Sequence, residues 1–572
     1  MARIVKVAIA GSGLTGLTAA WLLMRPTKNQ DVKFEVHIFE KHNSLGMDAA
    51  SMSLIDEQSK EQWRVDVPLR AFQGGYYPQL ISMYKKLGVR IREADFTYSL
   101  ALFTPSGPNS KRKITSTFIY NGLSGRAGFG KPSSLGKMFK GTAFTGFFMQ
   151  LWSWLVFAFM TLETIFCFLV SAIYAAPFFR SADIENKSFG EWADEATPRN
   201  LLARLIGLDC AWRSYVRDIM VPMYSAMCTA TSEDILSYPA VDFLGERSLF
   251  HICYRIGLKL ILIPDLIWLT IGTHHYLLAN GVREVVAALS KDLKNVHLSA
   301  PITSITLDPK APHLASITYL KPSGEEHTLH GFDHVVFATE AKTAAAILTS
   351  WASSLSEKFS LPVRDFKENI LKQAEALGKF HYTTSIVVNH TDDTLLPDDP
   401  RDCRELNLIY YHGQELGNSE KHPDRDSSVC VSSSFTMATH TLTRPEGYPA
   451  HLPDVYQSTN PYIPPKKGTI LSVARMQRAV PTVEARKALQ GFCEEKERKW
   501  WQCPAVASTK PGPLQGAGRM TGARTPGIWV CGSYAFFGIP LLEGCVVSAK
   551  NVAMQGIMAC EGTELKEEPW AV

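Results

Sequence analysis

The sequence predicts an α/β fold, and three observations along the chain indicate it. A short apolar run near the N-terminus leads directly into a glycine-rich turn and a helix-like segment. The same alternation of strand-like and helix-like segments returns at residues 273–345 and again at residues 515–572. A dense apolar stretch, residues 142–179, lies between the first and second of these regions. We therefore expect an α/β domain that is discontinuous in sequence, a second region of α+β type, and an apolar helical insertion.

The N-terminal turn has the glycine spacing of a dinucleotide-binding, Rossmann-like unit. A buried strand is expected up to Ala10, and the helix is expected to begin directly after the turn. The first glycine permits the sharp turn, the second lets a pyrophosphate approach the backbone, and the third lets the helix pack close to the strand. The first turn of the helix offers N–H groups and a positive dipole end to phosphate. The residues expected at the pyrophosphate are Gly11, Gly13, Leu14, Thr15 and Gly16.

An acidic residue follows the second expected strand. Residues 34–39 are apolar at most positions and end at Glu40, which is followed by Lys41. A carboxylate at this place accepts hydrogen bonds from ribose hydroxyls, so both residues are expected beside the nucleotide. A glycine-rich turn without any ligand is the alternative. The order of strand, glycines, helix, strand and acid favours the binding site.

Composition sets limits on the class of protein. The chain has 572 residues, of which 46% are hydrophobic and 20% are charged, and this indicates a folded protein with more than one domain. A formal net charge of +4 is small for this length, and we find no nucleic-acid-binding motif. The 11 cysteines include no CxxC pair and are expected to be reduced, in a protein that faces the cytosol. The sequence also shows no set of residues with the spacing of metal ligands, so we expect no bound metal ion.

The apolar stretch at residues 142–179 is long enough to span a bilayer, and Glu163 is its only formal charge. Because the α/β segments before and after it belong to one domain, both of its flanks must lie on one side of a membrane. Three arrangements remain open: a hairpin that dips into the bilayer, a helix that lies in the interface, or a buried pair of helices. Basic residues on both flanks suit anionic lipid head groups, so we expect a membrane-associated protein.

The remaining segments complete the expected organisation. Residues 1–100, 273–345 and 515–572 are expected to form the nucleotide-binding domain, and residues 101–272 and 346–514 the substrate region. Within it, residues 105–140 are rich in Gly, Ser, Pro and Lys and are expected to form a loop or mobile insertion. A second apolar stretch, Ile256 to Ile271, contains Lys259, Pro264 and Asp265 and is expected to be a packed or interfacial helix.

Several segments resemble the flavin-containing amine oxidase and phytoene desaturase superfamily, in a branch of amine oxidase-like flavoproteins. They are FEKHNSLGMDAAS, RVDVPLRAFQGGYYPQLISMYKKLGV, SAPITSI, HVVFATE and, near the C-terminus, GIWVCGSYAFFGIPLLEGCVVSA. The resemblance covers most of the chain apart from the apolar insertion. It implies a Rossmann-like domain that binds FAD, non-covalently, with the two ends of the chain meeting around one cofactor.

The resemblance also implies particular contacts to FAD. Four features of the family carry over to this chain. They are a glycine after the acid, a loop along the flavin, a backbone segment at the adenine, and a final helix whose N-terminus faces the flavin pyrimidine edge. A helix N-terminus there stabilises the negative charge of reduced flavin. Met47, Asp48 and Ser533 depart from the usual residues at their positions. The implied contacts are Gly46, Leu69, Arg70, Ile302, Gly532, Leu542, Glu543 and Val546.

The sequence identifies no catalytic residue. Two interpretations stay open for His274 and His275: one of them acts as a base near the flavin, or both are ordinary loop residues. Two also stay open for Tyr534, Phe536 and Phe537: they form an aromatic wall over the flavin, or they belong to the ordinary core. Cys545 is expected to be a small packing residue.

The expected function follows from the cofactor and the apolar insertion. We expect an FAD-dependent oxidoreductase, namely an oxidase, desaturase or isomerase, that acts on a lipophilic substrate such as a fatty-acyl or isoprenoid molecule at a membrane. Two alternatives stay open. One is a soluble oxidase of small amines, and the other is a non-catalytic lipid-binding chaperone of the Rab GDP-dissociation-inhibitor type.

Overall fold

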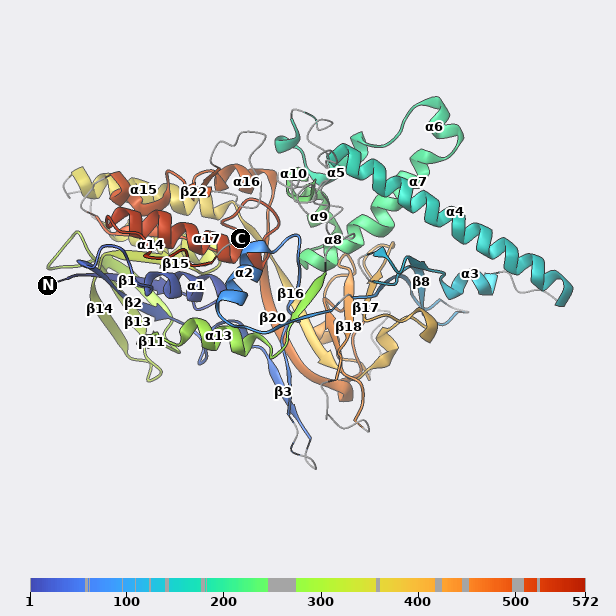
Figure 1. Ribbon diagram of the computed structural model, residues 1–572, viewed down its shortest axis with the longest axis horizontal. Coiled ribbons are helices and arrows are strands. Elements are labelled where there is room, and N and C mark those ends of the chain that lie inside the picture. Colours follow the sequence, from blue (N-terminus) through green and yellow to red (C-terminus); the bar gives the residue numbers. More distant parts are fainter. Residues whose placement is uncertain are drawn as a thin grey trace.

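A computed structural model describes most of the chain, and Figure 1 shows its elements. The described residues are 2–56, 60, 62–94, 96–107, 110–122, 125–138, 143–175, 181, 183–244, 274–355, 361–416, 424–444, 452–495, 509–521 and 525–570. The apolar stretch from Ile256 to Ile271 lies outside the described residues.

A five-stranded parallel sheet with the order β11-β2-β1-β15-β23 forms the centre of the nucleotide-binding domain. Its strands come from three distant parts of the chain, which confirms the expected discontinuity. The bounds are β1 Arg3–Ala10, β2 Val32–Phe39, β11 Asn295–His297, β15 His334–Phe337 and β23 Gly527–Val530. Glycine at the end of β1 and the acid at the end of β2 therefore meet at one edge of the sheet.

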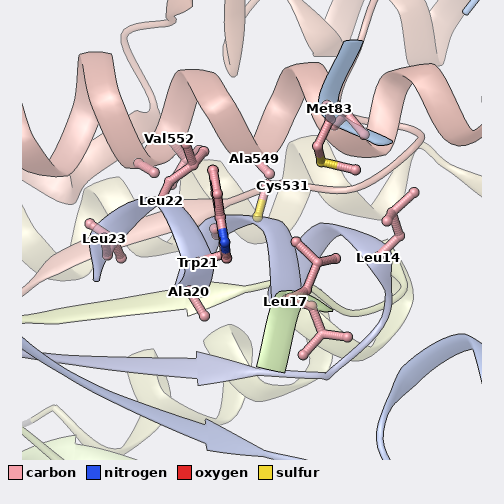
Figure 2. Packing of buried hydrophobic residues seen from close by; sticks show 14 of the residues in the cluster. Leu14, Leu17, Ala20, Trp21, Leu22, Leu23, Met83, Cys531, Ala549 and Val552 are labelled. Carbon is pink, nitrogen blue, oxygen red and sulfur yellow. The ribbon is translucent and has the colours of Figure 1, made fainter. Parts of the chain in front are cut away.

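Helices cover both faces of this sheet. Val7 and Ile9 of β1 pack in the layer that contains α1 (Leu14–Leu23) and α17 (Leu542–Lys550), while Ala8 and Ala10 face the opposite layer. Figure 2 shows the first layer, in which α1 lies between the sheet and the helix that carries Ala549. The N-terminal and C-terminal segments thus share one core.

The second layer consists mainly of α14 (Ala341–Ser354) and α15 (Leu361–Gly378). Trp351 and Phe366 of these helices are buried and pack with the sheet. The boundary expected at residue 346 falls inside α14. Residues 346–378 therefore pack with the nucleotide-binding domain, because the second face of its sheet needs an apolar cover.

A mixed eight-stranded sheet forms the second region, in the order β20-β16-β19-β18-β17-β7-β8-β9. Its strands are β7 Tyr98–Thr104, β8 Lys113–Tyr120, β9 Phe129–Gly130, β16 His381–His390, β17 Leu406–Tyr410, β18 Met437–Thr441, β19 Tyr456–Thr459 and β20 Ile470–Val480. The expectation of a loop over residues 105–140 is wrong. The segment contains β8, β9 and α3 (Ser133–Met138), because the alternating sequence KITSTFIY pairs along the whole of β7.

A small sheet and a helical layer join the two regions. The small sheet has the order β5-β10-β6, with bounds Ala71–Gln73, His275–Leu278 and Ile91–Glu93. Helix α2 (Pro78–Lys86) follows β5, and α13 (Val282–Ser290) follows β10. The helical layer contains α5 Phe189–Glu195, α7 Leu208–Tyr215, α8 Val221–Cys228, α9 Ser232–Ser237 and α10 Ala240–Leu244. Its core includes Val480 of β20 and Ile539 near the start of α17, so these regions pack as one body.

The apolar insertion is one continuous helix, α4 (Ala143–Ala175), which runs along the outside of the helical layer (Figure 1). A hairpin and a buried helical pair are therefore both wrong for this segment. Residues Gly146–Tyr174 are long and apolar enough to cross a membrane by length and composition, and the apolar window of this helix is only 17% buried. Ser153 and Ser171 mark the face of α4 that packs on the protein, and both are buried. The opposite face, with Phe159 and Leu162, is exposed.

Candidate dinucleotide-binding site and the adjoining cavity

The turn between β1 and α1 has the close packing that its glycines allow. Gly11 has a φ of +95°, and a Cβ atom there would lie 2.7 Å from the carbonyl oxygen of Ala338. A Cβ atom on Gly16 would lie 2.1 Å from the carbonyl oxygen of Gly11, so only glycine fits at either position. Gly13 differs, because a Cβ atom there would meet no described atom within 4 Å. The open space at Gly13 is the place where a ligand can approach the backbone.

The start of α1 faces this space. Gly13 is the N-cap residue, and no side chain caps the helix. The first N–H groups of an α-helix have no partner within the helix, and they carry the positive end of its dipole. Leu14, Thr15 and Gly16 occupy this first turn. The geometry suits a bound pyrophosphate.

Glu40 is held in a hydrogen-bond network beside the turn. Its Oε2 atom accepts hydrogen bonds from the backbone N–H of Ser12 at 3.0 Å and from Ser12 Oγ at 2.6 Å. Its Oε1 atom accepts from the backbone N–H of His42 at 2.9 Å. Each carboxylate oxygen has two lone pairs, so Oε1 retains an acceptor site for a ribose hydroxyl. Lys41, the neighbouring residue, is exposed.

Two more of the expected residues are placed against this network. Gly46 donates its N–H to Ser12 Oγ at 2.9 Å, and a Cβ atom on Gly46 would lie 2.6 Å from the Ser12 carbonyl oxygen. The backbone N–H of Ala300 donates to the carbonyl oxygen of Glu40 at 2.8 Å. Ile302 begins β12 (Ile302–Leu307) two residues later. The segment expected at the adenine therefore lies beside the acid expected at the ribose.

The C-terminal element meets the same site from the other side. Gly532 follows β23, and Ser548 of α17 bonds to both its N–H and its carbonyl oxygen, at 3.1 and 3.0 Å. Leu542, the first residue of α17, lines a cavity, and Val546 is fully buried in the core shared with α1. The start of α17 is therefore fixed next to the start of α1.

Glu543 has a different role from the one that its position suggests. Its carboxylate accepts the backbone N–H groups of Gln79 and Leu80, at 2.9 and 3.0 Å, at the start of α2. Burial raises the pKa of this carboxyl to about 7. Both oxygens are therefore engaged by the start of α2, so the described contacts of this side chain are structural.

A cavity of about 390 Å³ begins at this junction and extends between the two regions. Arg70, Leu542 and Cys545 lie at its nucleotide-binding end. One face of the eight-stranded sheet forms a long wall, and α8 contributes two methionines opposite. The apolar and aromatic lining residues of this part are Tyr98, Tyr120, Met223, Met227, Leu406, Leu408 and Ala438. Among the residues that the structure describes, no aspartate or glutamate lines the cavity.

The two residues expected along the flavin lie at the cavity end. Leu69 donates its N–H to Gln457 Oε1 at 2.6 Å, which ties this loop to β19. Arg70 lines the cavity, and its Nε atom is buried without a hydrogen-bond partner among the described residues. An unpartnered guanidinium nitrogen indicates that an acceptor belongs next to it. Together with the open space at Gly13, it fits a dinucleotide that extends from the turn into the cavity.

Other candidate residues divide between the cavity and the core. His275 lines the cavity, whereas His274 lies 3.6 Å from Glu93. Tyr534 and Phe537 are buried in the core on the α14 side of the sheet, so of the two alternatives this pair takes that of ordinary core. Cys545 lines the cavity, and burial raises the pKa of its thiol.

Sequence reasoning missed Arg478, which lines the cavity from β20. The strand alternation of β20 places Arg478 and Arg475 on opposite faces, but a sequence does not tell which face meets the cavity. The described residues also contain no group of three or more His, Cys, Asp or Glu side chains that is arranged to hold a metal ion.

The chain was compared with curated proteins, solved structures and protein families. No curated protein matches the chain. Among solved structures, a putrescine oxidase double mutant with redesigned cofactor binding is 12% identical, with 96% of this chain and 99% of that chain covered and a TM-score of 0.47. Cyclohexylamine oxidase from Brevibacterium oxydans is 11% identical, with 96% and 98% covered and a TM-score of 0.47. An oxidoreductase from Methanosarcina mazei is 10% identical, with 95% and 99% covered and a TM-score of 0.44.

The family match concerns the N-terminal segment. Residues 9–87 match the family described as NAD(P)-binding Rossmann-like domain. The match begins at the end of β1 and ends just after α2, so it contains the glycine turn and Glu40. This part of the chain is therefore similar to NAD(P)-binding Rossmann-like domains.

Proposed function

We propose that the protein is an FAD-dependent oxidoreductase of the amine oxidase-like type, which acts on a lipophilic substrate at a membrane. One observation carries the proposal: the start of α17 lines one end of a mainly apolar cavity and packs in the same core as Leu14 of the dinucleotide turn. A cofactor that extends from the turn reaches the cavity directly.

The arrangement favours FAD over a nicotinamide dinucleotide. The C-terminal helix returns to the first turn of α1, and its uncapped N-terminus lies beside the cavity. Bound FAD supplies hydride and electron acceptance, which protein side chains do not offer. The residues of this chain would hold it: Gly13 and the start of α1 at the pyrophosphate, Glu40 at the ribose, and Arg70 with the start of α17 at the flavin end.

The walls of the cavity favour a lipophilic substrate. Leu406, Leu408 and Ala438 from the sheet, and Met223 and Met227 from α8, present apolar surface along the part that lies away from the nucleotide. Apolar walls with few polar groups bind hydrocarbon and exclude water from the reacting atoms. A fatty-acyl or isoprenoid molecule fits this chemistry, and the reaction would be an oxidation, a desaturation or an isomerisation.

The exposed face of α4 supports a membrane location. Phe159 and Leu162 are 67% and 66% exposed. Helix α6 (Leu201–Leu205), which contacts the same helix α7 as α4 does, adds Leu202 and Leu205 at 68% and 74% exposed. An apolar surface of this kind marks an interaction site, and a bilayer would bury it.

The orientation of α4 favours insertion parallel to the membrane surface. Its inner face packs on the protein at Ser153 and Ser171, and Lys131 bonds to Ser153 and stacks 4.5 Å from the Trp154 ring. A crossing helix would have to break these contacts. We propose a protein that lies on the membrane with its nucleotide-binding domain in the cytosol.

The two alternatives predict different sites. A soluble oxidase of small amines would meet a substrate that is largely cationic in water, whereas the described residues that line this cavity include Arg70 and Arg478 but no acidic side chain. A lipid-binding chaperone would not need the open space at Gly13 or an acid with a free acceptor site at Glu40. Both features favour the flavin enzyme.

The decisive experiment is the visible absorbance spectrum of the purified protein. We expect a flavin spectrum and the release of FAD on heat denaturation, because non-covalent contacts hold the cofactor. Colourless protein that takes up no FAD on incubation would contradict the enzyme and leave the chaperone. Mass spectrometry of lipids extracted from the same preparation would identify the substrate class.

A further inference from the structure

Two arginines from different regions of the fold meet at the flavin end of the cavity. Arg70 follows the strand β4 (Gln62–Val65) on the nucleotide-binding side, and Arg478 lies near the end of β20 in the eight-stranded sheet. Both line the cavity, as does Cys545 in the first turn of α17. Burial and the charge of Arg70 lower the pKa of Arg478 to about 10, so Arg478 remains charged at neutral pH.

Neither guanidinium group has an ion-pair partner among the described residues. The Nε atoms of Arg70 and Arg478 are buried without a hydrogen-bond partner in the described part of the chain, and the Nη2 atom of Arg478 donates to Met476 Sδ at 3.6 Å. Burial lowers the pKa of Arg70 and the charge of Asp66 opposes this, but the Asp66 carboxylate is bonded elsewhere. Its Oδ1 and Oδ2 atoms accept the backbone N–H of Val282 at 3.1 and 3.0 Å. Two partly buried cations whose charges repel each other are costly without an anion, so this end of the cavity favours one.

The position of Arg478 decides which anion it meets. The pairing of β20 through β16, β19 and β18 puts Arg478 on the same sheet face as Thr459 and Ala438. These residues also line the cavity, whereas the pyrophosphate site lies at the β1–α1 turn in the other domain. Arg478 therefore belongs to the wall that meets the substrate, and Arg70 belongs to the side that meets the cofactor.

We propose that Arg478, supported by Arg70, binds the carboxylate of a long-chain lipophilic acid whose hydrocarbon tail lies along the apolar wall. This substrate class rests on the proposed function, because the carboxylate end would lie beside the flavin. A guanidinium group offers parallel N–H donors that match the two oxygens of a carboxylate. The carboxylate would neutralise the uncompensated charge, and Leu406, Leu408 and Met223 would bury the chain.

The test compares oleate with oleyl alcohol, which share the chain and differ in the charged end group. Binding to the purified protein is measured by isothermal titration calorimetry, with the ligands below the concentration at which they aggregate. We expect oleate to bind more tightly by roughly 10- to 100-fold, the range that a hydrogen bond to a charged group gives. Equal binding of the two ligands would overturn the proposal without any variant.

Substitutions then test whether the preference for oleate depends on Arg478. R478M should lose the preference for oleate and retain its FAD content, and R478K should recover part of the preference. R475M is the matched control, because Arg475 lies three residues away on the exposed face of β20 and should change neither property. If R478M loses FAD and keeps the preference for oleate, Arg478 serves the phosphate or flavin anion of the cofactor and the proposal fails.

The two proposals fail separately. Calorimetry does not depend on bound flavin, so a colourless protein that still prefers oleate contradicts only the oxidoreductase. A yellow protein that binds oleate and oleyl alcohol equally contradicts only the carboxylate site.

Discussion

The Oε1 atom of Glu543 accepts the backbone N–H of Gln79 at 2.9 Å, and this contact joins the first turn of α17 to the first turn of α2. The second oxygen accepts the N–H of Leu80 at 3.0 Å. An acidic side chain from one helix therefore caps the N-terminus of another, where the dipole favours negative charge. Since α17 begins at the cavity, this cap also fixes the position of the helix start that would face the flavin.

Removal of the cap should destabilise the protein. In E543A the N–H groups of Gln79 and Leu80 lose their acceptors in a buried place, at a cost of about 1–3 kcal/mol for each. We expect E543Q to lose less, because its amide oxygen still accepts one bond. Chemical denaturation measures both. E564A removes an exposed glutamate that pairs with Lys28 and is the control, and an equal loss in the control would contradict this role of Glu543.

The same carboxyl predicts a dependence of stability on pH. Its pKa is about 7 in the folded protein and near 4.5 in the unfolded chain. Between these values the folded protein holds a proton that the unfolded chain releases, so this group's contribution to stability falls as the pH rises from about 4.5 to 7. The loss is roughly 1.4 kcal/mol per unit of difference in pKa.

A comparison of the wild type with E543Q isolates this group. The difference in the free energy of unfolding between them should shift against the wild type as the pH rises through this window and stay constant above it. A difference that is flat from pH 4.5 to 7 would show that the folded pKa is not raised.

The local elements of the nucleotide-binding domain follow from the sequence because each has a short-range cause. The strand before Gly11, the helix from Leu14 and the late helix from Leu542 lie where their patterns predict. The partner of Glu543 and the position of Arg478 depend instead on contacts between distant segments. Short-range sequence patterns do not reveal which face of a strand lines a cavity, or which helix N-terminus an acidic side chain caps.

Two glycines of the turn separate binding from folding. Gly13 has room for a Cβ atom and an ordinary φ of −61°, so we expect G13A to fold with a stability within about 0.5 kcal/mol of the wild type. The added methyl group would occupy the space proposed for the pyrophosphate, so FAD retention should fall roughly tenfold or more. Absorbance after dialysis measures the retention. Full retention would place the pyrophosphate elsewhere.

G16A is the contrasting variant in the same turn. A Cβ atom at 2.1 Å from the Gly11 carbonyl oxygen forces the helix away from the strand. We expect a loss of stability of about 1–3 kcal/mol or more, seen as earlier thermal unfolding even in FAD-free protein. Unchanged unfolding of G16A would contradict the close packing of α1 on β1.

The exposed face of α4 predicts membrane binding that does not depend on the active site. Full burial of a Phe or Leu side chain contributes about 1.5–3 kcal/mol, so the double variant F159S/L162Q should bind vesicles at least tenfold more weakly. Phosphatidylcholine vesicles that contain phosphatidylserine, separated by flotation, measure the binding. Both side chains are about two-thirds exposed, so the stability of the variant in solution should stay close to that of the wild type.

The control for α4 is L371Q, which changes a leucine that is 43% exposed on α15. This helix covers the sheet of the nucleotide-binding domain, away from α4 in Figure 1, so its substitution should leave vesicle binding unchanged. Equal weakening by L371Q would mean that general hydrophobicity drives the binding. If the wild type stays with the unbound fraction, the exposed apolar face of α4 serves a protein partner, and the FAD content of F159S/L162Q should still equal that of the wild type.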